Sequence, residues 1–146
     1  EGQGEGEGQG EGQGESEDPQ GREGGFQVTT PTSAKTWNAV YVGQRLMGGT
    51  VVVSVDGKEL SPKEGQRIWC HSPDGFEWGY GGSGPAQLAL SLLLHATFGD
   101  EVTALRLYQD FKFEVVAGFN RDHWTLTREA IHQWIITKLG NYGGGL

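Results

Sequence analysis

The stretch that decides the fold is EWGYGGSGPAQLALSLLL, residues 77–94. Its glycine-rich turn at residues 81–84 is followed by Pro85 and a long apolar run. Proline is favoured at the first position of a helix, because its φ angle is already helical and its missing N–H would be unpaired there. Ser83 or Gly84 suits the N-cap position before it. The stretch therefore predicts a strand that turns sharply into a buried helix.

Three nucleotide-binding or catalytic templates resemble parts of this turn. Residues 79–84 match GxGxxG, but a dinucleotide fold needs a parallel strand after the helix, and here a second helix follows. Pro85 stands where a P-loop requires lysine. It also stands where a lipase-type GxSxG turn requires its second glycine. Ser83 has no candidate base near it in the sequence. The N–H groups of a helix start attract negative charge, so a weak anion contact stays compatible with a plain strand-to-helix turn.

The sequence before this turn favours strands. Aromatic and β-branched residues form short runs that are separated by glycine and proline turns, which is typical of hairpins. We expect an antiparallel meander of about four strands, at residues 37–46, 50–55, 66–71 and 76–78.

The sequence after the turn favours helices. Apolar residues at helical spacing predict one helix at 85–98, one at 101–116, and one that follows an N-cap threonine near 125 and ends at Gly140. Gln87, Ser91 and His95 recur every four residues in the first helix, where they form a narrow polar stripe on an apolar cylinder. The predicted fold class is α+β, a small antiparallel meander sheet followed by three helices packed on one face.

Composition divides the chain into three parts. The segment 1–25 holds eight of the 19 acidic residues, one of the 11 basic residues and ten of the 26 glycines. Such a segment lacks the apolar surface that would offset its ordering entropy. We therefore predict a disordered acidic tail and linker at 1–36, a single α+β domain at 37–140, and a frayed C-terminus at 141–146.

The same composition argues against several classes of function. Without the tail, ten basic residues face 11 acidic ones, so the domain is nearly neutral and nucleic-acid binding is disfavoured. The single cysteine and four scattered histidines suggest neither a disulfide framework nor a metal site, and no cofactor is predicted. The longest apolar run is too short to span a bilayer, so we expect no membrane insertion and a cytoplasmic location.

Several unusual strings in the chain point to one family. The string FEWGYGGSGPAQLALSLL, with YVGQRL before it and YQDFKFEVVAGF and WTLT after it, resembles a small prokaryotic family catalogued as domain of unknown function 6166. The resemblance runs from Tyr41 to Ile135 and leaves the acidic tail outside. It implies no assigned activity, so it transfers no catalytic role to any residue here.

The candidate binding residues surround the glycine turn. Phe76, Trp78 and Tyr80 alternate, so in a strand they share one face, which is either core or a recognition patch. Gln87, one turn into the helix, either bonds the loop backbone or faces a ligand. The ligand- or partner-binding candidates are Trp78, Tyr80, Gly81, Gly82, Ser83, Gly84 and Gln87. No catalytic or metal-ligating residue is assigned.

Four other residues receive structural interpretations. We expect Cys70 to be a small buried residue in a strand. Glu77 is expected to be a solvated carboxylate, and Lys112 a surface charge on the second helix. Trp124 is expected in the core.

Two functional hypotheses follow. The first is a non-enzymatic binding or accessory module that acts through the aromatic and glycine-rich turn and binds a protein partner, with the acidic tail as an element suited to a basic partner. The alternative is a small enzyme or ligand-binding protein that uses the helix start at Gly81–Gly84 as an anion site. An open pocket at Ser83, reached by His71, His95 or Lys112, would favour the alternative.

Overall fold

The computed structural model describes residues 37–143, with side chains as far as Gly140. The chain divides into two units at Trp37, and the account below concerns the second unit, Asn38–Leu146. The predicted acidic tail of residues 1–36 lies outside the described residues, as do residues 144–146.

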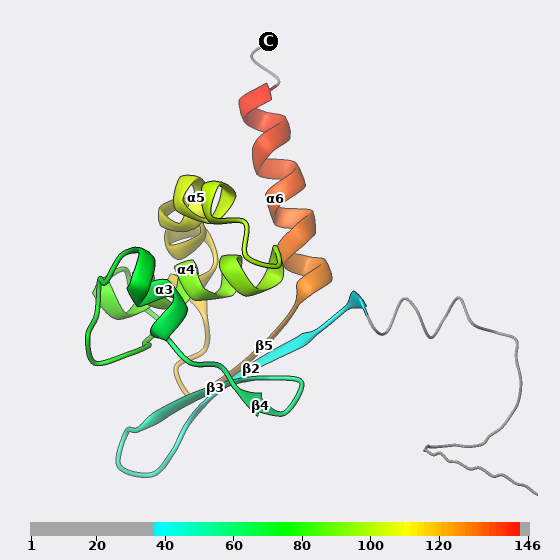
Figure 1. Ribbon diagram of the computed structural model, residues 1–146. Coiled ribbons are helices and arrows are strands. Elements are labelled where there is room, and N and C mark those ends of the chain that lie inside the picture. The colour runs from blue at the N-terminus through cyan, green and yellow to red at the C-terminus, as the bar shows by residue number, and fades with distance from the viewer. Residues whose placement is uncertain (1–36, 144–146) are drawn as a thin grey trace, which may run out of the picture. The chain divides into compact units, whose positions relative to one another are not determined.

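The second unit is an α+β structure with a four-stranded antiparallel sheet in the order β4-β3-β2-β5 (Figure 1). The strands are β2 (Val40–Arg45), β3 (Val51–Val55), β4 (Lys58–Glu59) and β5 (His123–Thr127). The helices are α3 (Lys63–Ile68), α4 (Ser83–Ala96), α5 (Glu101–Glu114), the 3-10 turn η1 (Val116–Gly118) and α6 (Arg128–Gly143).

One face of the sheet forms the floor of the core. Side chains alternate between the two faces of a strand, so Tyr41 and Gly43 on β2 lie on the same side. Tyr41 is fully buried there, and so nearly are Val53 of β3 and Trp124 of β5, which both pair with Gly43. Figure 1 shows α3, α4 and α5 together on one side of the sheet.

Helix α4 is the centre of the core. Eleven of its residues from Gly84 to Leu94 are buried in succession, and the helix contacts α3, α5 and α6. The polar stripe predicted on it is also largely enclosed, since Gln87 is 0 % and Ser91 3 % exposed. The helix is therefore covered on all sides, and its polar residues need partners inside the protein.

Two of the predicted strands are not strands. Residues 66–71 begin within helix α3 and continue as a loop, and residues 76–78 are a loop throughout. A Cβ on Gly65 would lie 2.7 Å from Ser91 Oγ, so the absence of a side chain lets α3 lie directly against α4. The fourth strand is instead β5, which pairs with the free edge of β2. The sheet therefore is not a simple meander.

The ends of two helices also differ from the prediction. The N-cap of α4 is Gly82, not Ser83 or Gly84, and the helix begins at Ser83. Helix α6 does not end at Gly140 but continues to Gly143. Thr127 Oγ1 accepts a hydrogen bond from Ala130 N at 3.0 Å, as expected of an N-cap threonine.

Candidate functional site

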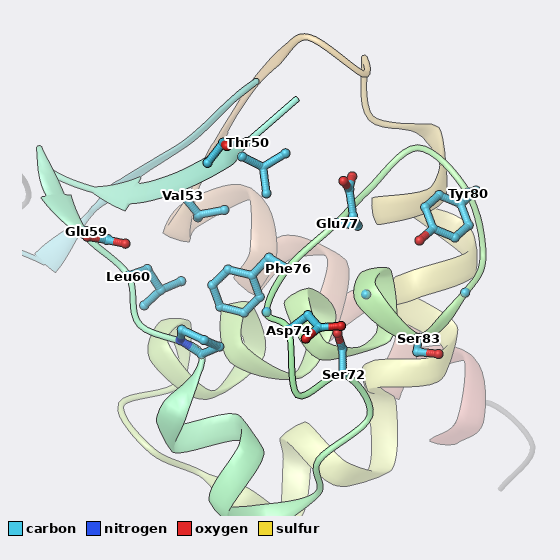
Figure 2. A pocket seen from close by; sticks show the side chains of 15 residues that line it. Thr50, Val53, Glu59, Leu60, Ser72, Asp74, Phe76, Glu77, Tyr80 and Ser83 are labelled. Atoms are coloured by element: carbon cyan, nitrogen blue, oxygen red, sulfur yellow. The ribbon is translucent and has the colours of Figure 1, made fainter. Parts of the chain in front are cut away.

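A cleft of about 750 Å³ lies between the sheet and the aromatic–glycine loop, which we define as residues 76–84. Figure 2 shows Phe76 in the middle of this cleft, with Val53 and Leu60 on one side and Tyr80 and Ser83 on the other. A space of this size matches the range of ligand-binding clefts. The loop that the sequence marked as a candidate site therefore forms one wall of a cleft.

Close contacts explain two glycines of the loop. A Cβ on Gly82 would lie 2.6 Å from Cε2 of Tyr80, and a Cβ on Gly84 would lie 2.7 Å from Cβ of Glu77. Real Cβ atoms do not approach other atoms this closely, so glycine is required at position 84, where the clash is with the Glu77 Cβ and backbone, whereas a side chain at position 82 would have to displace the Tyr80 ring. Packing of the loop against itself leaves the Tyr80 side chain 46 % exposed at the rim of the cleft.

The charges that line the cleft are all negative among the described residues. They belong to Glu59, Asp74 and Glu77, and no Lys, Arg or His of the described residues contributes to the lining. Arg45 balances the charge of Glu77, whereas Glu59 and Asp74 are exposed. The cleft thus combines apolar and aromatic side chains with a field that attracts cations.

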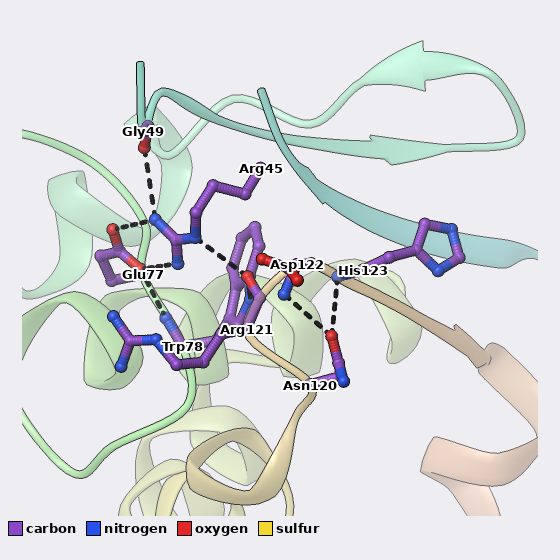
Figure 3. A network of polar contacts seen from close by, with 8 residues as sticks. All are labelled: Arg45, Gly49, Glu77, Trp78, Asn120, Arg121, Asp122 and His123. Atoms are coloured by element: carbon purple, nitrogen blue, oxygen red, sulfur yellow. Dashed lines mark hydrogen bonds and ion pairs between the residues drawn. The ribbon is translucent and has the colours of Figure 1, made fainter. Parts of the chain in front are cut away.

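Glu77 is not the solvated carboxylate expected from the sequence. Its two carboxylate oxygens accept hydrogen bonds from Arg45, at 3.0 Å from Nη1 and 2.7 Å from Nη2 (Figure 3). Such a two-pronged ion pair is stronger and more rigid than a single contact. The hydrogen bonds from Arg45 hold the pKa of Glu77 below its usual value.

The same arginine joins the loop to two other segments. Arg45 Nε donates to the carbonyl oxygen of Arg121 at 2.9 Å, and Nη1 donates to that of Gly49 at 3.2 Å. Trp78 Nε1 donates to the same Arg121 oxygen at 3.0 Å, as Figure 3 allows the reader to follow. The network fixes the base of the loop, so Glu77 supports the cleft wall and is not available as a free catalytic carboxylate.

The three larger candidate residues have different surroundings. Trp78 is fully buried, so it belongs to the core and does not contribute a recognition surface. Tyr80 is exposed beside the cleft, and with no strand at 76–78 the two residues do not share a face. Gln87 does bond loop backbone, but in residues 69–72: Oε1 accepts from His71 N at 2.7 Å and Ser72 N at 3.0 Å, and Nε2 donates to Trp69 O at 3.3 Å.

The start of α4 does open on the cleft, through Gly82, Ser83 and Gly84. His71, His95 or Lys112 would favour an anion there, but none of the three lines the cleft. An anion at Ser83 would instead face the carboxylates described above. The electrostatics of the cleft therefore favour a cationic ligand over the anion considered from the sequence.

Aromatic and polar side chains form a cluster around His71, which lies in the loop 69–72. The ring of His71 stacks on Trp69, with ring centroids 5.7 Å apart, and its Nε2 is hydrogen-bonded to Tyr108 Oη at 2.6 Å. Burial, and then the nearby charge of Lys112, lower the pKa of His71 below its ordinary value of 6.5. This histidine is a neutral, satisfied structural group at neutral pH.

Two side chains differ from the expectations for them. Cys70 lies in an exposed loop and not in a buried strand, because the segment around it is the end of α3 and the following loop. Lys112 is only 7 % exposed, and its ammonium group lies 4.0 Å from the centre of the Phe113 ring. The long methylene chain of lysine can be covered in this way while its charged end stays near the surface.

Within the described residues, no three side chains of the types His, Cys, Asp and Glu come together as a metal site. In the same part of the chain, none of the helices has the length and apolar character needed to cross a bilayer.

Comparison with known proteins gives one match. The model of a family of unknown function, DUF6166, matches residues 41–137, which include both the aromatic–glycine loop and the Arg45–Glu77 network. The chain belongs to this family. Neither the curated proteins nor the solved structures contain a significant match to the chain. Membership of DUF6166 confirms the resemblance drawn from the sequence and carries no activity with it.

The partly buried histidines His71 and His95 predict a pH dependence of stability. His95, like His71, has a pKa lowered below 6.5, first by burial and then by the charge of Arg128. The unfolded chain then binds more protons than the folded one, so the free energy of unfolding is greatest above pH 6.5. We expect it to fall as the pH drops through 6.5 towards the folded pKa values. Urea unfolding at pH 7.5, 6.5 and 5.5 measures this slope.

A control isolates the histidines from other titrating groups. The variant His71→Gln with His95→Gln is expected to show a shallower slope between pH 7.5 and 5.5, whatever its absolute stability. Equal slopes for the variant and the wild type would contradict the assignment.

Proposed function

We propose that this member of the DUF6166 family is a non-enzymatic binding module whose cleft receives a basic, partly apolar segment of a protein partner. The observation that carries the proposal is the lining of the cleft, in which Phe76 and Tyr80 lie among carboxylates without any basic side chain of the described residues. Aromatic rings and carboxylates together are suited to lysine and arginine side chains, through cation–π contacts and ion pairs.

The rigidity of the cleft supports binding with little rearrangement. The Arg45–Glu77 pair and the buried Trp78 hold the loop to the sheet and to the segment at Arg121. A preformed site avoids part of the ordering cost of association. The lining residues that remain exposed for contact are Tyr80 and Ser83 on the loop, Asp74 just before it, and Thr50 and Glu59.

The predicted acidic tail would act with the cleft and not in place of it. Long-range attraction between an acidic segment and a basic partner raises the rate of encounter and weakens with salt. The contacts in the cleft would then determine which apolar side chains are accepted.

The proposal predicts that charge reversal in the cleft weakens binding of a basic peptide. The probe is a fluorescein-labelled decapeptide of alternating lysine and leucine, with alternating glutamate and leucine as its acidic counterpart. We expect Asp74→Lys to weaken binding of the basic peptide about tenfold, because it replaces attraction by repulsion inside the cleft. The matched control is Glu129→Lys on α6, which makes the same change of net charge outside the cleft and is expected to change affinity less than about twofold.

Fluorescence anisotropy titrations with these two variants and with a chain lacking residues 1–25 separate the contribution of the cleft to binding from that of residues 1–25. Loss of all binding on deletion of 1–25, with no effect of Asp74→Lys, would assign recognition to the tail and contradict the cleft. Equal binding of the acidic peptide would contradict the charge argument.

A further inference from the structure

Strand β4 is two residues long and covers only the C-terminal end of the edge of β3. Beyond it, Leu60 N donates to the carbonyl oxygen of Val53 at 2.8 Å. The same register would place Pro62 opposite Val51, but Pro62 has the helical angles φ −75° and ψ −5° and begins the turn into α3. Proline also has no N–H group to donate. Among the described residues, the edge of β3 at Val51 therefore has no strand beside it.

The backbone of Val51 faces this open edge. Leu46 N donates to the carbonyl oxygen of Thr50 at 2.7 Å, so residue 50 directs its backbone groups towards β2. In an antiparallel pair this direction alternates along the strand, so residue 51 directs its N–H and C=O groups away from β2. Its partner Arg45 agrees with the alternation, because Arg45 N donates to Asp122 O, on the far side of β2, at 2.9 Å. No residue that the structure describes bonds the two backbone groups of Val51.

The cleft opens along this same edge. Figure 2 shows Val53 and Leu60 on one side of Phe76 and the rest of the aromatic–glycine loop on the other. The residues that line the cleft on the side of the sheet are Thr50, Val51, Val53, Glu59, Leu60 and Pro62. An extended segment in the cleft would therefore have the backbone of Val51 on one side and the aromatic–glycine loop on the other.

We propose that the basic partner segment binds as a short strand, antiparallel to β3, that adds to the sheet at Val51. This inference rests on the proposed function, because it concerns the same segment in the same cleft. The Val51 N–H would donate to a carbonyl oxygen of the segment, and the Val51 carbonyl oxygen would accept an N–H from it. In this mode of recognition the main-chain bonds provide affinity, and pockets for alternate side chains provide specificity.

The geometry of the sheet also decides which side chains of the segment enter the cleft. Residues directly opposite each other in two strands have their side chains on one face. Val51 shares its face with Val53, which is buried in the core. The segment residue that pairs with Val51 would thus point into the cleft, where the carboxylates of Glu59 and Asp74 favour lysine or arginine. Its two neighbours would lie on the outer face, beside the half-buried Val52.

The first test uses the full wild-type chain and three forms of the lysine–leucine decapeptide. One is unmodified, one is N-methylated at every lysine, and one is N-methylated at every leucine, so the two methylated peptides have the same composition and charge. In the added strand, the lysines that point into the cleft are also the residues whose N–H groups face Val51. Methylation of the lysines should therefore weaken binding about tenfold or more in fluorescence anisotropy, and methylation of the leucines less than about threefold.

The outcomes separate this inference from the proposed function. Equal binding of the three peptides, equal losses with both methylated forms, or a larger loss with the methylated leucines would overturn the added strand. Charge-dependent binding in the cleft would survive each of these results if Asp74→Lys still weakened binding of the unmodified peptide. Failure of the unmodified peptide to bind would contradict both.

The second test examines the edge itself by amide hydrogen exchange. In the free chain the N–H of Val51 should exchange faster than that of Val52, which the alternation directs at β2, and the unmodified peptide should slow it. The variant Val51→Pro removes this N–H at an edge position that tolerates proline, so affinity should fall about tenfold. Val51→Ala keeps the N–H and should lose clearly less affinity, and thermal unfolding checks that both variants fold. Equal protection of Val51 and Val52 in the free chain, or wild-type affinity in a folded Val51→Pro, would overturn the proposal.

Discussion

Replacement of Gly43 by alanine is expected to lower the free energy of unfolding by about 3 kcal/mol or more, at the upper end of the cost of overpacking a core. The added Cβ would lie 2.1 Å from Nε1 and 2.2 Å from Cε2 of the Trp124 indole. Gly43 and Trp124 are direct partners in the register of β2 and β5, so the indole lies flat over the glycine. One methyl group therefore requires either the ring or the strand to move.

The surroundings of Trp124 prevent the ring from moving. Its indole stacks on Phe119 with ring centroids 4.2 Å apart, and it meets Trp78 edge-on at 5.6 Å. Trp124 is 5 % exposed, and Trp78 is itself fixed by its bond to Arg121. Displacement of the indole would disturb three aromatic side chains and the pairing of β5 with β2, so the clash cannot be relieved locally.

Urea unfolding followed by tryptophan fluorescence measures the effect. The matched control is Gly140→Ala in α6, where a Cβ meets no atom within 4 Å. Alanine has the higher helix propensity, so this control is expected to raise the free energy of unfolding by up to about 1 kcal/mol. A loss below about 1 kcal/mol in Gly43→Ala would contradict the packing described for Trp124.

Replacement of Gln87 by leucine is expected to lower the free energy of unfolding by about 2–4 kcal/mol, the cost of leaving three partly buried backbone groups without the partner that Gln87 provides. Leucine has a similar volume, but it cannot accept the N–H groups of His71 and Ser72 or donate to the carbonyl of Trp69. The loss would be concentrated in the segment 69–72. Amide hydrogen exchange should therefore show faster exchange at His71 and Ser72 before any global change.

Ser91→Ala provides the comparison within the same helix. Ser91 lies one turn after Gln87 and is equally enclosed, but its Oγ bonds to none of the described residues. Its removal is expected to change stability by less than about 1 kcal/mol. If Gln87→Leu and Ser91→Ala cost the same, the hydrogen bonds of Gln87 do not hold the 69–72 segment.

The elements predicted correctly are those with local signals. Pro85 after a run of glycines defines the start of α4 to within two residues, and the apolar spacing after residue 101 defines α5. The α+β class follows from the change along the chain from short strand-favouring runs to apolar residues at helical spacing. The pairing of β5 with β2 has no such signal, because it depends on a register between residues about 80 positions apart.

The binding candidates around the glycine turn also depend on local signals, and their role in binding stays a prediction. The loop residues Tyr80, Gly82, Ser83 and Gly84 do line a cleft. The sequence could not show that Glu59 and Asp74 line the same cleft, since Glu59 comes from β4 and no local signal places Asp74 there. Trp78 is of a residue type that is common in recognition surfaces, but it is buried, and its Nε1 donates to the carbonyl oxygen of Arg121. The sequence gives no signal that Arg128 of α6 lies next to His95 of α4, because this contact depends on how the two helices pack.

The order of strands in the sheet has a consequence for synthesis of the chain. Strand β2 is the second from the edge in the finished sheet, but its partner β5 is the last strand to leave the ribosome. Until residue 127 has emerged, the hydrogen-bonding groups along one side of β2 have no strand to pair with, and exposed edges of this kind promote aggregation. A nascent chain that stalls before β5 would thus be the vulnerable species, and rapid synthesis through residue 127 would protect the protein during its production.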